Sequence, residues 1–230
     1  MSQPTKYKHA YISREQLEQL TAGARVIEKD RRGDKVLELN NGHIFKIFTS
    51  RSRLSKSWWL PYSINFARNA QLLVSRSIPT IEIRALYKLP DPGKTAVEYQ
   101  PLPGNTLDKC IAPYKDKDSL SEQLGDFMAE LHSKGIYFRA VHPGNILLDD
   151  QGRWGLIDIA DLRYFKSPLS QNKRLRNFHH LLRRQRFFPY LKLLNGQKLI
   201  SSYCHSCGDI DDSQLHRGLQ KIWHHYLANS

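Results

Sequence analysis

Asn145 and Asp158 stand at the two ends of a segment with the pattern of a β-hairpin. Two short apolar runs, 145–148 and 154–159, are separated by Asp149-Asp150-Gln151-Gly152, which is typical of a hairpin turn. Such a hairpin returns the chain, so that the amide oxygen of Asn145 and the carboxylate of Asp158 face the same point. Mg²⁺ is a hard cation that prefers oxygen ligands. The spacing therefore predicts a magnesium site, with the alternative that Asn145 caps the hairpin and Asp158 ends a strand.

The segment before this hairpin, Phe138-Arg139-Ala140-Val141-His142-Pro143-Gly144-Asn145, resembles the catalytic loop of the protein-kinase-like superfamily. In the small-molecule branch of that superfamily the loop often reads His-Gly-Asp-Leu-His-Pro-Gly-Asn, and the last four positions match. The distance from Asn145 to Asp158 also matches the distance from the loop asparagine to the metal-binding Asp-Phe-Gly segment. The resemblance implies ATP and Mg²⁺ as cofactors, with Asn145 and Asp158 as metal ligands.

Ala140 stands where the resemblance places the aspartate that accepts the proton of the substrate hydroxyl. A positioned base contributes about 10²- to 10⁴-fold to the rate, whereas positioning and charge neutralisation supply most of phosphoryl-transfer catalysis. Loss of the base should therefore slow the transfer without forbidding it. His142 is a candidate substitute base, and a structural hydrogen bond is the alternative role for its side chain.

Lys46 lies in the apolar run Ile44-Phe45-Lys46-Ile47-Phe48, which resembles the third-strand Val-Ala-Ile-Lys motif of kinases. By that resemblance Lys46 binds nucleotide phosphates, while backbone groups of Tyr99, Gln100 and Leu102 contact adenine. The alternative for Lys46 is a side chain that snorkels from the edge of a sheet.

Two further positions depart from the kinase pattern. The helix expected over 65–75 contains no Glu to pair with the lysine of the third strand, which leaves Asn69 or Gln71 as the nearest polar candidates. The turn at 31–34 holds one glycine where many protein kinases have several, so the loop over the phosphates is poor in flexible backbone amides. Both departures weaken the expectation of catalysis.

The surrounding pattern predicts an α+β, bilobal protein-kinase-like fold in a single domain over 1–230. A meander of strands at 24–30, 35–39 and 43–48, the helix at 65–75 and a hairpin of strands at 80–89 and 95–100 make a small antiparallel lobe over about 20–100 with five strands and one helix. The lobe over 101–230 is mainly helical. Ser119 and Glu122 have the spacing of a capping box for a helix over 119–134, and the pattern is again helical from Gln171 onward.

The formal net charge of +13 implies an anionic partner, which could be nucleic acid, an acidic membrane surface or a phosphorylated substrate. The sequence shows no recognised nucleic-acid-binding motif, so nucleic acid is not an expected partner. The sequence contains no apolar run of about 18 residues, which would indicate a membrane span, and no apolar stretch at 1–8, which would indicate export. A cytoplasmic protein is expected, with peripheral association with the inner membrane as a further expectation.

Basic residues recur over about four expected helical turns after residue 171. Their alternation with apolar residues predicts an amphipathic helix whose cationic face stays in water and contacts an anionic membrane surface, where each basic residue contributes about 1 kcal/mol. The alternative is a solvated face that only aids solubility. The residues are Lys173, Arg174, Arg176, Arg183, Arg184 and Arg186, and a second basic stretch contains Arg51, Arg53 and Lys56.

Four segments narrow the resemblance to the bacterial lipopolysaccharide core (Kdo/heptose) kinases, including the toluene tolerance proteins. They are Ile-Pro-Thr at 78–80, Leu-Pro-Gly-Asn-Thr-Leu at 102–107, Gly-Ile-Tyr-Phe-Arg at 135–139 and Leu-Ile-Asp-Ile-Ala-Asp-Leu-Arg at 156–163. The resemblance implies a phosphotransferase whose partner is a lipopolysaccharide core intermediate or another anionic sugar phosphate. The alternative is a pseudokinase that binds nucleotide and acts as a scaffold or regulator in lipopolysaccharide biosynthesis.

Cys204 and Cys207 form a Cys-x-x-Cys pair with an interposed His. A single pair supplies only half of a tetrahedral zinc site. Two buried or unreactive thiols are therefore expected, with a metal or redox role as the alternative.

Overall fold

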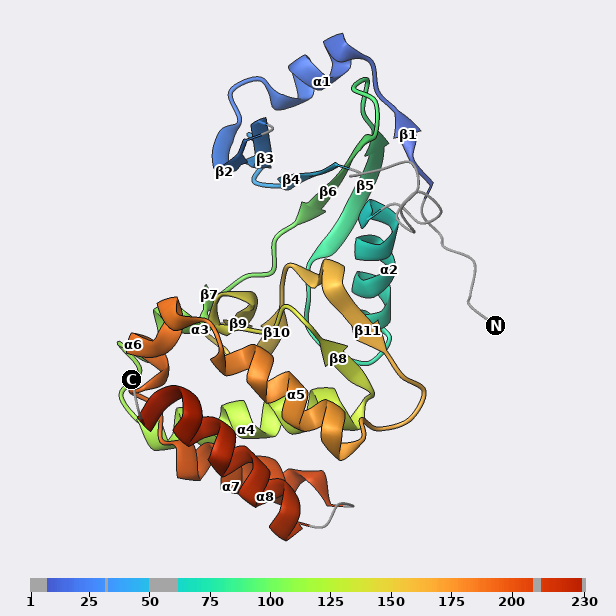
Figure 1. Ribbon diagram of the computed structural model, residues 1–230. Helices are drawn as coiled ribbons and strands as arrows, with labels where there is room; N and C mark the ends of the chain where they lie inside the picture. The colour runs from blue at the N-terminus through green and yellow to red at the C-terminus, as the bar shows by residue number, and fades with distance from the viewer. Residues whose placement is uncertain (1–7, 32, 50–61, 209–211, 229–230) are drawn as a thin grey trace. The chain divides into compact units, whose positions relative to one another are not determined.

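The computed structural model describes residues 8–31, 33–49, 62–208 and 212–228 (Figure 1). The chain divides into two compact units, Met1–Leu102 and Pro103–Ser230. The basic stretch with Arg51, Arg53 and Lys56 lies outside the described residues.

The N-terminal unit is built on a six-stranded sheet with the strand order β1-β5-β6-β4-β3-β2. Neighbouring strands are antiparallel except for the parallel pair β1 and β5. The meander and the hairpin predicted from the sequence are confirmed, with boundaries that differ by one or two residues. The strands are β1 (Ala10–Tyr11), β2 (Arg25–Asp30), β3 (Gly33–Glu38), β4 (Ile44–Thr49), β5 (Glu82–Lys88) and β6 (Lys94–Gln100).

Two helices cover the sheet of this unit. Helix α2 (Tyr62–Val74) packs against β5 and β6, and Phe66 and Leu73 on its inner face are fully buried. Helix α1 (Arg14–Thr21) packs Leu17 and Leu20 against a separate apolar cluster that includes Phe45. The sequence prediction of five strands and one helix missed β1 and α1. The signal for α1 is a capping box, in which Ser13 Oγ accepts from Gln16 N–H and Gln16 Oε1 accepts from Ser13 N–H.

The C-terminal unit is mainly helical, with short strands in two small sheets. Strand β9 lies between β7 and β10, and β8 pairs antiparallel with β11. Its elements are β7 (Asn105–Thr106), α3 (Leu107–Ile111), α4 (Lys117–Ser133), β8 (Ile136–Phe138), η2 (Pro143–Asn145), β9 (Ile146–Leu148), β10 (Trp154–Leu156), η3 (Ile159–Asp161), β11 (Leu162–Tyr164), α5 (Gln171–Leu182), η4 (Gln185–Phe187), α6 (Phe188–Leu191), α7 (Gly196–Cys207), α8 (Asp212–Trp223) and the π-helical turn η5 (His224–Ala228). The α+β class is confirmed, with an antiparallel-sheet unit followed by a mainly helical unit, as the kinase-like fold predicts.

Two helix boundaries in this unit differ from the prediction. The N-cap of α4 is Asp116, whose side chain accepts from Ser119 N–H at 2.9 Å, so the predicted cap at Ser119 was wrong. Helix α5 ends at Leu182, so the basic residues from Arg183 onward do not continue its face. Arg174 is only 2% exposed and donates to the carbonyl of Leu169, and its predicted place on a solvated cationic face was also wrong.

A buried polar network connects the helices to the end of β8. His132 Nε2 lies 2.9 Å from Asn177 Oδ1, and Asn177 Nδ2 donates to the carbonyl of Phe138 at 2.7 Å. Because Asn177 Oδ1 can only accept, His132 Nε2 carries the proton and Nδ1 accepts from the Tyr203 hydroxyl at 2.7 Å. The network fixes Phe138, the last residue before the loop that contains Ala140.

Burial in this network makes the stability of the protein depend on pH. Desolvation lowers the pKa of His132 from 6.5 to about 3. Between these values the unfolded chain binds a proton that the folded chain does not, so the stability that neutral His132 contributes is present above 6.5 and is lost as the pH falls toward 3. We expect His132→Gln to reduce the slope of unfolding free energy against pH by about 1.4 kcal/mol per pH unit near pH 5. Urea denaturation across this window measures the slope, and an unchanged slope in the variant would contradict the assignment.

Gly135 ends α4 with a left-handed backbone, φ +71°. A Cβ at this position would collide with the carbonyl oxygen of Phe165 and would lie 2.8 Å from that of Ser167. We expect Gly135→Ala to lower the unfolding free energy by about 3 kcal/mol, since left-handed strain and overpacking each cost about 1–3 kcal/mol. Gly152→Ala is the matched control, because Gly152 has φ +76° but no atom within 4 Å of its added Cβ. Equal losses in the two variants by urea denaturation would show that strain alone decides.

Candidate functional site

The loop between β8 and η2 is closed by main-chain hydrogen bonds at both ends. Val141 N–H donates to the carbonyl of Phe138 at 3.1 Å, and Asn145 N–H donates to that of His142 at 2.8 Å. Val141, His142 and Pro143 are buried, whereas Ala140 is half-buried. The loop is thus part of the packed interior and presents its residues in a fixed conformation.

The hairpin that follows joins the two predicted metal ligands. Strands β9 and β10 pair antiparallel, with Ile146 opposite Leu156. Ile157 N–H, one residue before Asp158, donates to the carbonyl of Asn145 at 3.0 Å. Asp158 itself is exposed and has left-handed backbone angles, φ 51° and ψ 45°. The structure thus brings the neighbouring backbone segments of Asn145 and Asp158 together.

The side chain of Asn145 is oriented by the loop. Its Nδ2 donates to the carbonyl of Ala140 at 3.0 Å, which leaves the acceptor oxygen Oδ1 on the other side of the amide group. One amide oxygen and one carboxylate are few ligands for a metal held by protein alone. They fit Mg²⁺, which usually keeps several waters and is bound by one or two protein oxygens together with phosphate oxygens of a nucleotide. In the part of the chain that the structure describes, no three His, Cys, Asp or Glu side chains are grouped as a metal cage.

His142 occupies a buried position beside this hairpin. His142 is 5% exposed, and its ring stacks on that of Phe187 with the ring centroids 5.0 Å apart and an interplanar angle of 23°. Desolvation, followed by the charges of Arg184 and Arg186, lowers the pKa of His142 to about 4, against the opposing effect of Asp158 and Asp108. The imidazole is therefore neutral at pH 7. Its burial and weak basicity favour packing of the loop over proton transfer from a substrate.

Lys46 of the N-terminal unit is 8% exposed, and its Nζ lies 5.5 Å from the centroid of Phe66 on α2. It is paired in register with Val97 of β6, so it shares a sheet face with α2. Glu98, the next residue of β6, points to the opposite face, where it contacts His43 Nδ1 at 2.7 Å and accepts from the Tyr87 hydroxyl at 2.8 Å. Lys46 is therefore a buried cation under α2 rather than a side chain at a sheet edge.

The predicted adenine contacts lie at the end of the same unit. Tyr99 and Gln100 are the last residues of β6, and the ring of Tyr99 lies 5.6 Å from that of Phe66. Leu102, the last residue of the unit, is half-buried and lies beyond the β6 ladder. The roles of Tyr99, Gln100 and Leu102 stay predictions.

Two residues near the loop, Asp108 and Phe187, were not predicted from the sequence, and Arg184 was predicted only as part of a cationic helix face. Asp108 lies on α3, which packs against η2, and its Oδ1 is buried without a hydrogen-bond partner among the described residues. Arg184 and Phe187 lie after α5 and affect His142 through charge and stacking. Nothing in the local sequence distinguishes them from other charged or apolar residues, since their closeness to the loop arises from tertiary packing.

The cysteine pair is buried in α7. Cys204 and Cys207 are both buried, as predicted, and Arg174 Nη1 donates to Cys207 Sγ at 2.8 Å. This contact makes Cys207 part of the interior polar network of the C-terminal unit.

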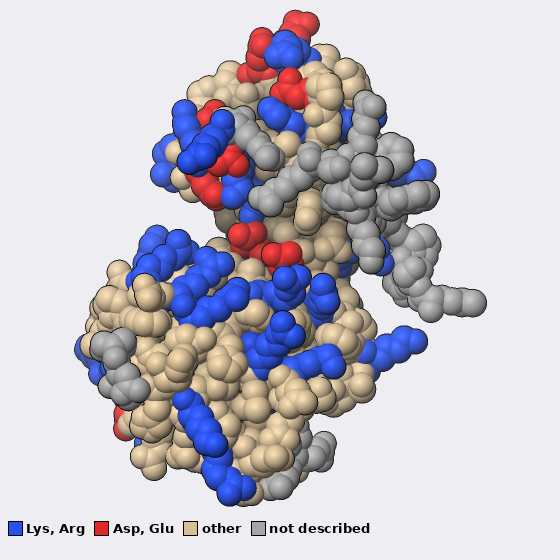
Figure 2. Space-filling view, in the orientation of Figure 1, with Lys and Arg blue, Asp and Glu red and all other residues tan. Residues whose placement is uncertain are grey.

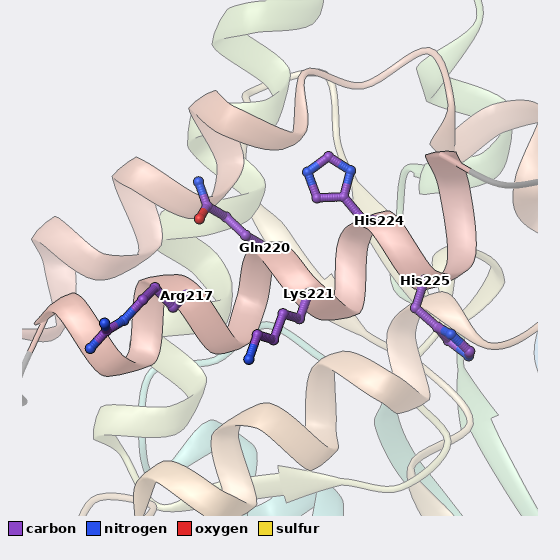
Figure 3. A pocket seen from close by; sticks show the side chains of 5 residues that line it. All are labelled: Arg217, Gln220, Lys221, His224 and His225. Atoms are coloured by element: carbon purple, nitrogen blue, oxygen red, sulfur yellow. The ribbon is translucent and has the colours of Figure 1, made fainter.

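A shallow basic depression lies elsewhere in the unit, on α8 and η5 (Figure 3). It contains none of the residues predicted for nucleotide or metal. The depression is lined by Arg217, Gln220, Lys221, His224 and His225.

Within the residues that the structure describes, no helix is both long enough and apolar enough to cross a lipid bilayer.

Comparison with known proteins gives little beyond the geometry. No protein-family model matches the sequence, and no curated protein matches it. Among solved structures, a co-crystal structure of WbdD and the kinase inhibitor LY294002 aligns with 83% of this chain and 42% of that chain, with a TM-score of 0.44 and 15% identity. The chain thus spans less than half the length of that solved protein.

Proposed function

We propose that the chain binds ATP with Mg²⁺ and acts as an atypical phosphotransferase of the lipopolysaccharide core kinase type, with a lipid-linked core sugar as acceptor. The observation that carries this proposal is the hydrogen bond from Ile157 N–H to the carbonyl of Asn145, at 3.0 Å. It joins the backbone of one predicted metal ligand to the residue before the other. The acceptor rests on the sequence resemblance alone.

In this proposal Asn145 Oδ1 and the carboxylate of Asp158 hold Mg²⁺, and Ala140 contributes its carbonyl, which orients the amide of Asn145. When bound, the metal would neutralise charge on the phosphate oxygens. Lys46 contributes a buried cation for nucleotide phosphates, and the backbone at Tyr99, Gln100 and Leu102 contacts adenine.

A second candidate function is favoured by Ala140. Its methyl group cannot accept a proton, and the nearby imidazole of His142 is buried with a pKa of about 4. A chain without a base can still bind nucleotide through its metal ligands and lysine. The alternative is therefore a pseudokinase that binds ATP and acts as a scaffold or regulator in lipopolysaccharide biosynthesis.

One assay separates the two functions. Calorimetry with ATP and Mg²⁺ measures nucleotide binding, and transfer of ³²P from ATP to purified core oligosaccharide measures turnover. Binding with transfer supports the phosphotransferase, and binding without transfer supports the pseudokinase. Absence of ATP binding at millimolar nucleotide would rule out both.

We also propose that the exposed arginines on and just after α5 associate with an anionic membrane surface. Arg176 on α5 and Arg183 just after it are exposed. Attraction of this kind is screened, because the Debye length falls from about 10 Å at 0.1 M salt to about 3 Å at 1 M. We expect sedimentation with anionic vesicles to be strong at low salt, weak at high salt and reduced in Arg176→Glu/Arg183→Glu. Vesicle binding that neither salt nor this variant changes would remove the physical basis for membrane association.

A further inference from the structure

The segment that follows α5 is held against the catalytic loop by an aromatic side chain. Phe187 is 4% exposed and stacks on the ring of His142 at 5.0 Å. Phe187 also packs against Gly144, since a Cβ added there would lie 3.1 Å from Phe187 Cζ. Packing therefore places Arg184, just before η4, and Arg186, within η4, beside the loop.

Arg184 and Arg186 both lie close to this contact. The guanidinium carbon of Arg186 is 4.6 Å from the centroid of the Phe187 ring. Arg184 is half-buried, and desolvation together with the charges of Arg186 and Arg183 lowers its pKa. The negative charge of Asp158 raises the pKa of Arg184. The cluster thus lies within electrostatic reach of the predicted metal ligand.

In the described part of the protein, Asp158 offsets the positive charge of this cluster only in part. Within the described residues, the side chains of Arg183, Arg184 and Arg186 make no ion pair and no hydrogen bond, whereas Arg153 in the same unit pairs with Asp149. Figure 2 shows Lys and Arg side chains gathered on the visible face of the C-terminal unit. Like charges held together and partly desolvated raise the free energy, and a bound anion offsets this cost.

We propose that Arg184 and Arg186 form a phosphate-binding site beside the catalytic loop. A guanidinium group donates two parallel hydrogen bonds to a phosphate, which makes a pair of arginines selective for this group over a single negative charge. The phosphate belongs to a ligand of the proposed phosphotransferase or pseudokinase, so the biological role rests on the proposed function. The terminal phosphates of a nucleotide and a phosphate on an acceptor sugar share the chemistry that the site recognises.

The site itself is tested with inorganic pyrophosphate, titrated into the whole protein in a calorimeter at low salt. We expect Arg184→Gln/Arg186→Gln to weaken binding roughly tenfold or more. Arg184→Lys/Arg186→Lys should lose less, because it keeps the charge but not the paired donors. The control is Arg217→Gln/Lys221→Gln, which removes the same charge from the depression on α8 (Figure 3). It should bind pyrophosphate as the wild type does.

Two further titrations identify the source of the phosphate. If the site holds the terminal phosphates of the nucleotide, the double Gln variant loses affinity for ATP but not for AMP. If it holds an acceptor phosphate, the variant keeps its affinity for ATP and no longer distinguishes core oligosaccharide from the same oligosaccharide treated with phosphatase. Either result supports the site.

The proposal is overturned if the double Gln variant binds pyrophosphate, ATP and phosphorylated oligosaccharide as the wild type does, including the case in which it loses only vesicle binding. It is also overturned if the α8 control loses as much pyrophosphate affinity as the double variant, since net charge would then explain the effect. Failure of the proposed function has a different signature, which is wild-type protein that does not bind ATP with Mg²⁺. The pyrophosphate titration remains decisive in that case.

Discussion

Asp158→Asn should reduce the affinity for ATP in the presence of Mg²⁺ to the value measured with a chelator, while the protein remains folded. The substitution keeps an oxygen at the position but removes the charge that a hard cation requires. Asn tolerates left-handed backbone angles as Asp does, so the φ of 51° at this position should not destabilise the variant. Calorimetric titrations of ATP with and without Mg²⁺ give the comparison.

Asp161→Asn is the matched control. Asp161 is an exposed carboxylate three residues further along, in η3, and lies outside the pair of predicted ligands. Its replacement should leave the Mg²⁺ dependence of ATP binding intact. If both variants lose it equally, the local negative charge matters and no specific ligand role is left for Asp158.

Ala140→Asp should raise phosphotransfer to core oligosaccharide by about 10²- to 10⁴-fold, the range that a positioned base contributes. The hydrogen bond that orients Asn145 uses the main-chain carbonyl of residue 140, so a new side chain need not disturb it. Residue 140 is half-buried, which leaves its side chain partly accessible to solvent. Single-turnover transfer of ³²P measures the chemical step.

Ala140→Asn controls for size and polarity, because its amide cannot accept a proton as a carboxylate does. Transfer that rises equally in the Asp and Asn variants would point to improved binding. Transfer that is already rapid in the wild type and falls in Ala140→Asp would mean that the base lies elsewhere. His142→Gln would then be the next variant, even though the burial of His142 favours a packing role.

The elements that could be predicted from the sequence are those whose information is local. The turn at 149–152 and the apolar runs beside it specify a hairpin, and the hairpin by itself joins the segments of Asn145 and Asp158. Helix α4 shows the limit of this reasoning. Ser119 and Glu122 have the spacing of a capping box, but Asp116 provides an earlier cap. The two alternatives differ in which side chain accepts from the free N–H groups and in where the helix begins.

The parts that could not be predicted depend on contacts between distant segments. Arg174 reads as one more basic residue of an amphipathic helix, and it is buried because Leu169, Tyr203 and Cys207 surround it with acceptors. Phe187 reads as an ordinary apolar residue after a helix, and only the folded chain places its ring on His142. Helix packing selects such pairs, and no periodicity in the sequence encodes them.

The left-handed conformation of Asp158 has a consequence for protein engineering. Left-handed backbone angles cost a non-glycine residue about 1–2 kcal/mol, of which the greater freedom of glycine in the unfolded chain cancels about 0.4–1 kcal/mol. Asp158→Gly should therefore be neutral or slightly stabilising while it removes a predicted metal ligand. A library selected only for thermal stability would accumulate glycine at this position and lose nucleotide binding unnoticed, so such a selection needs an ATP-binding step in every round.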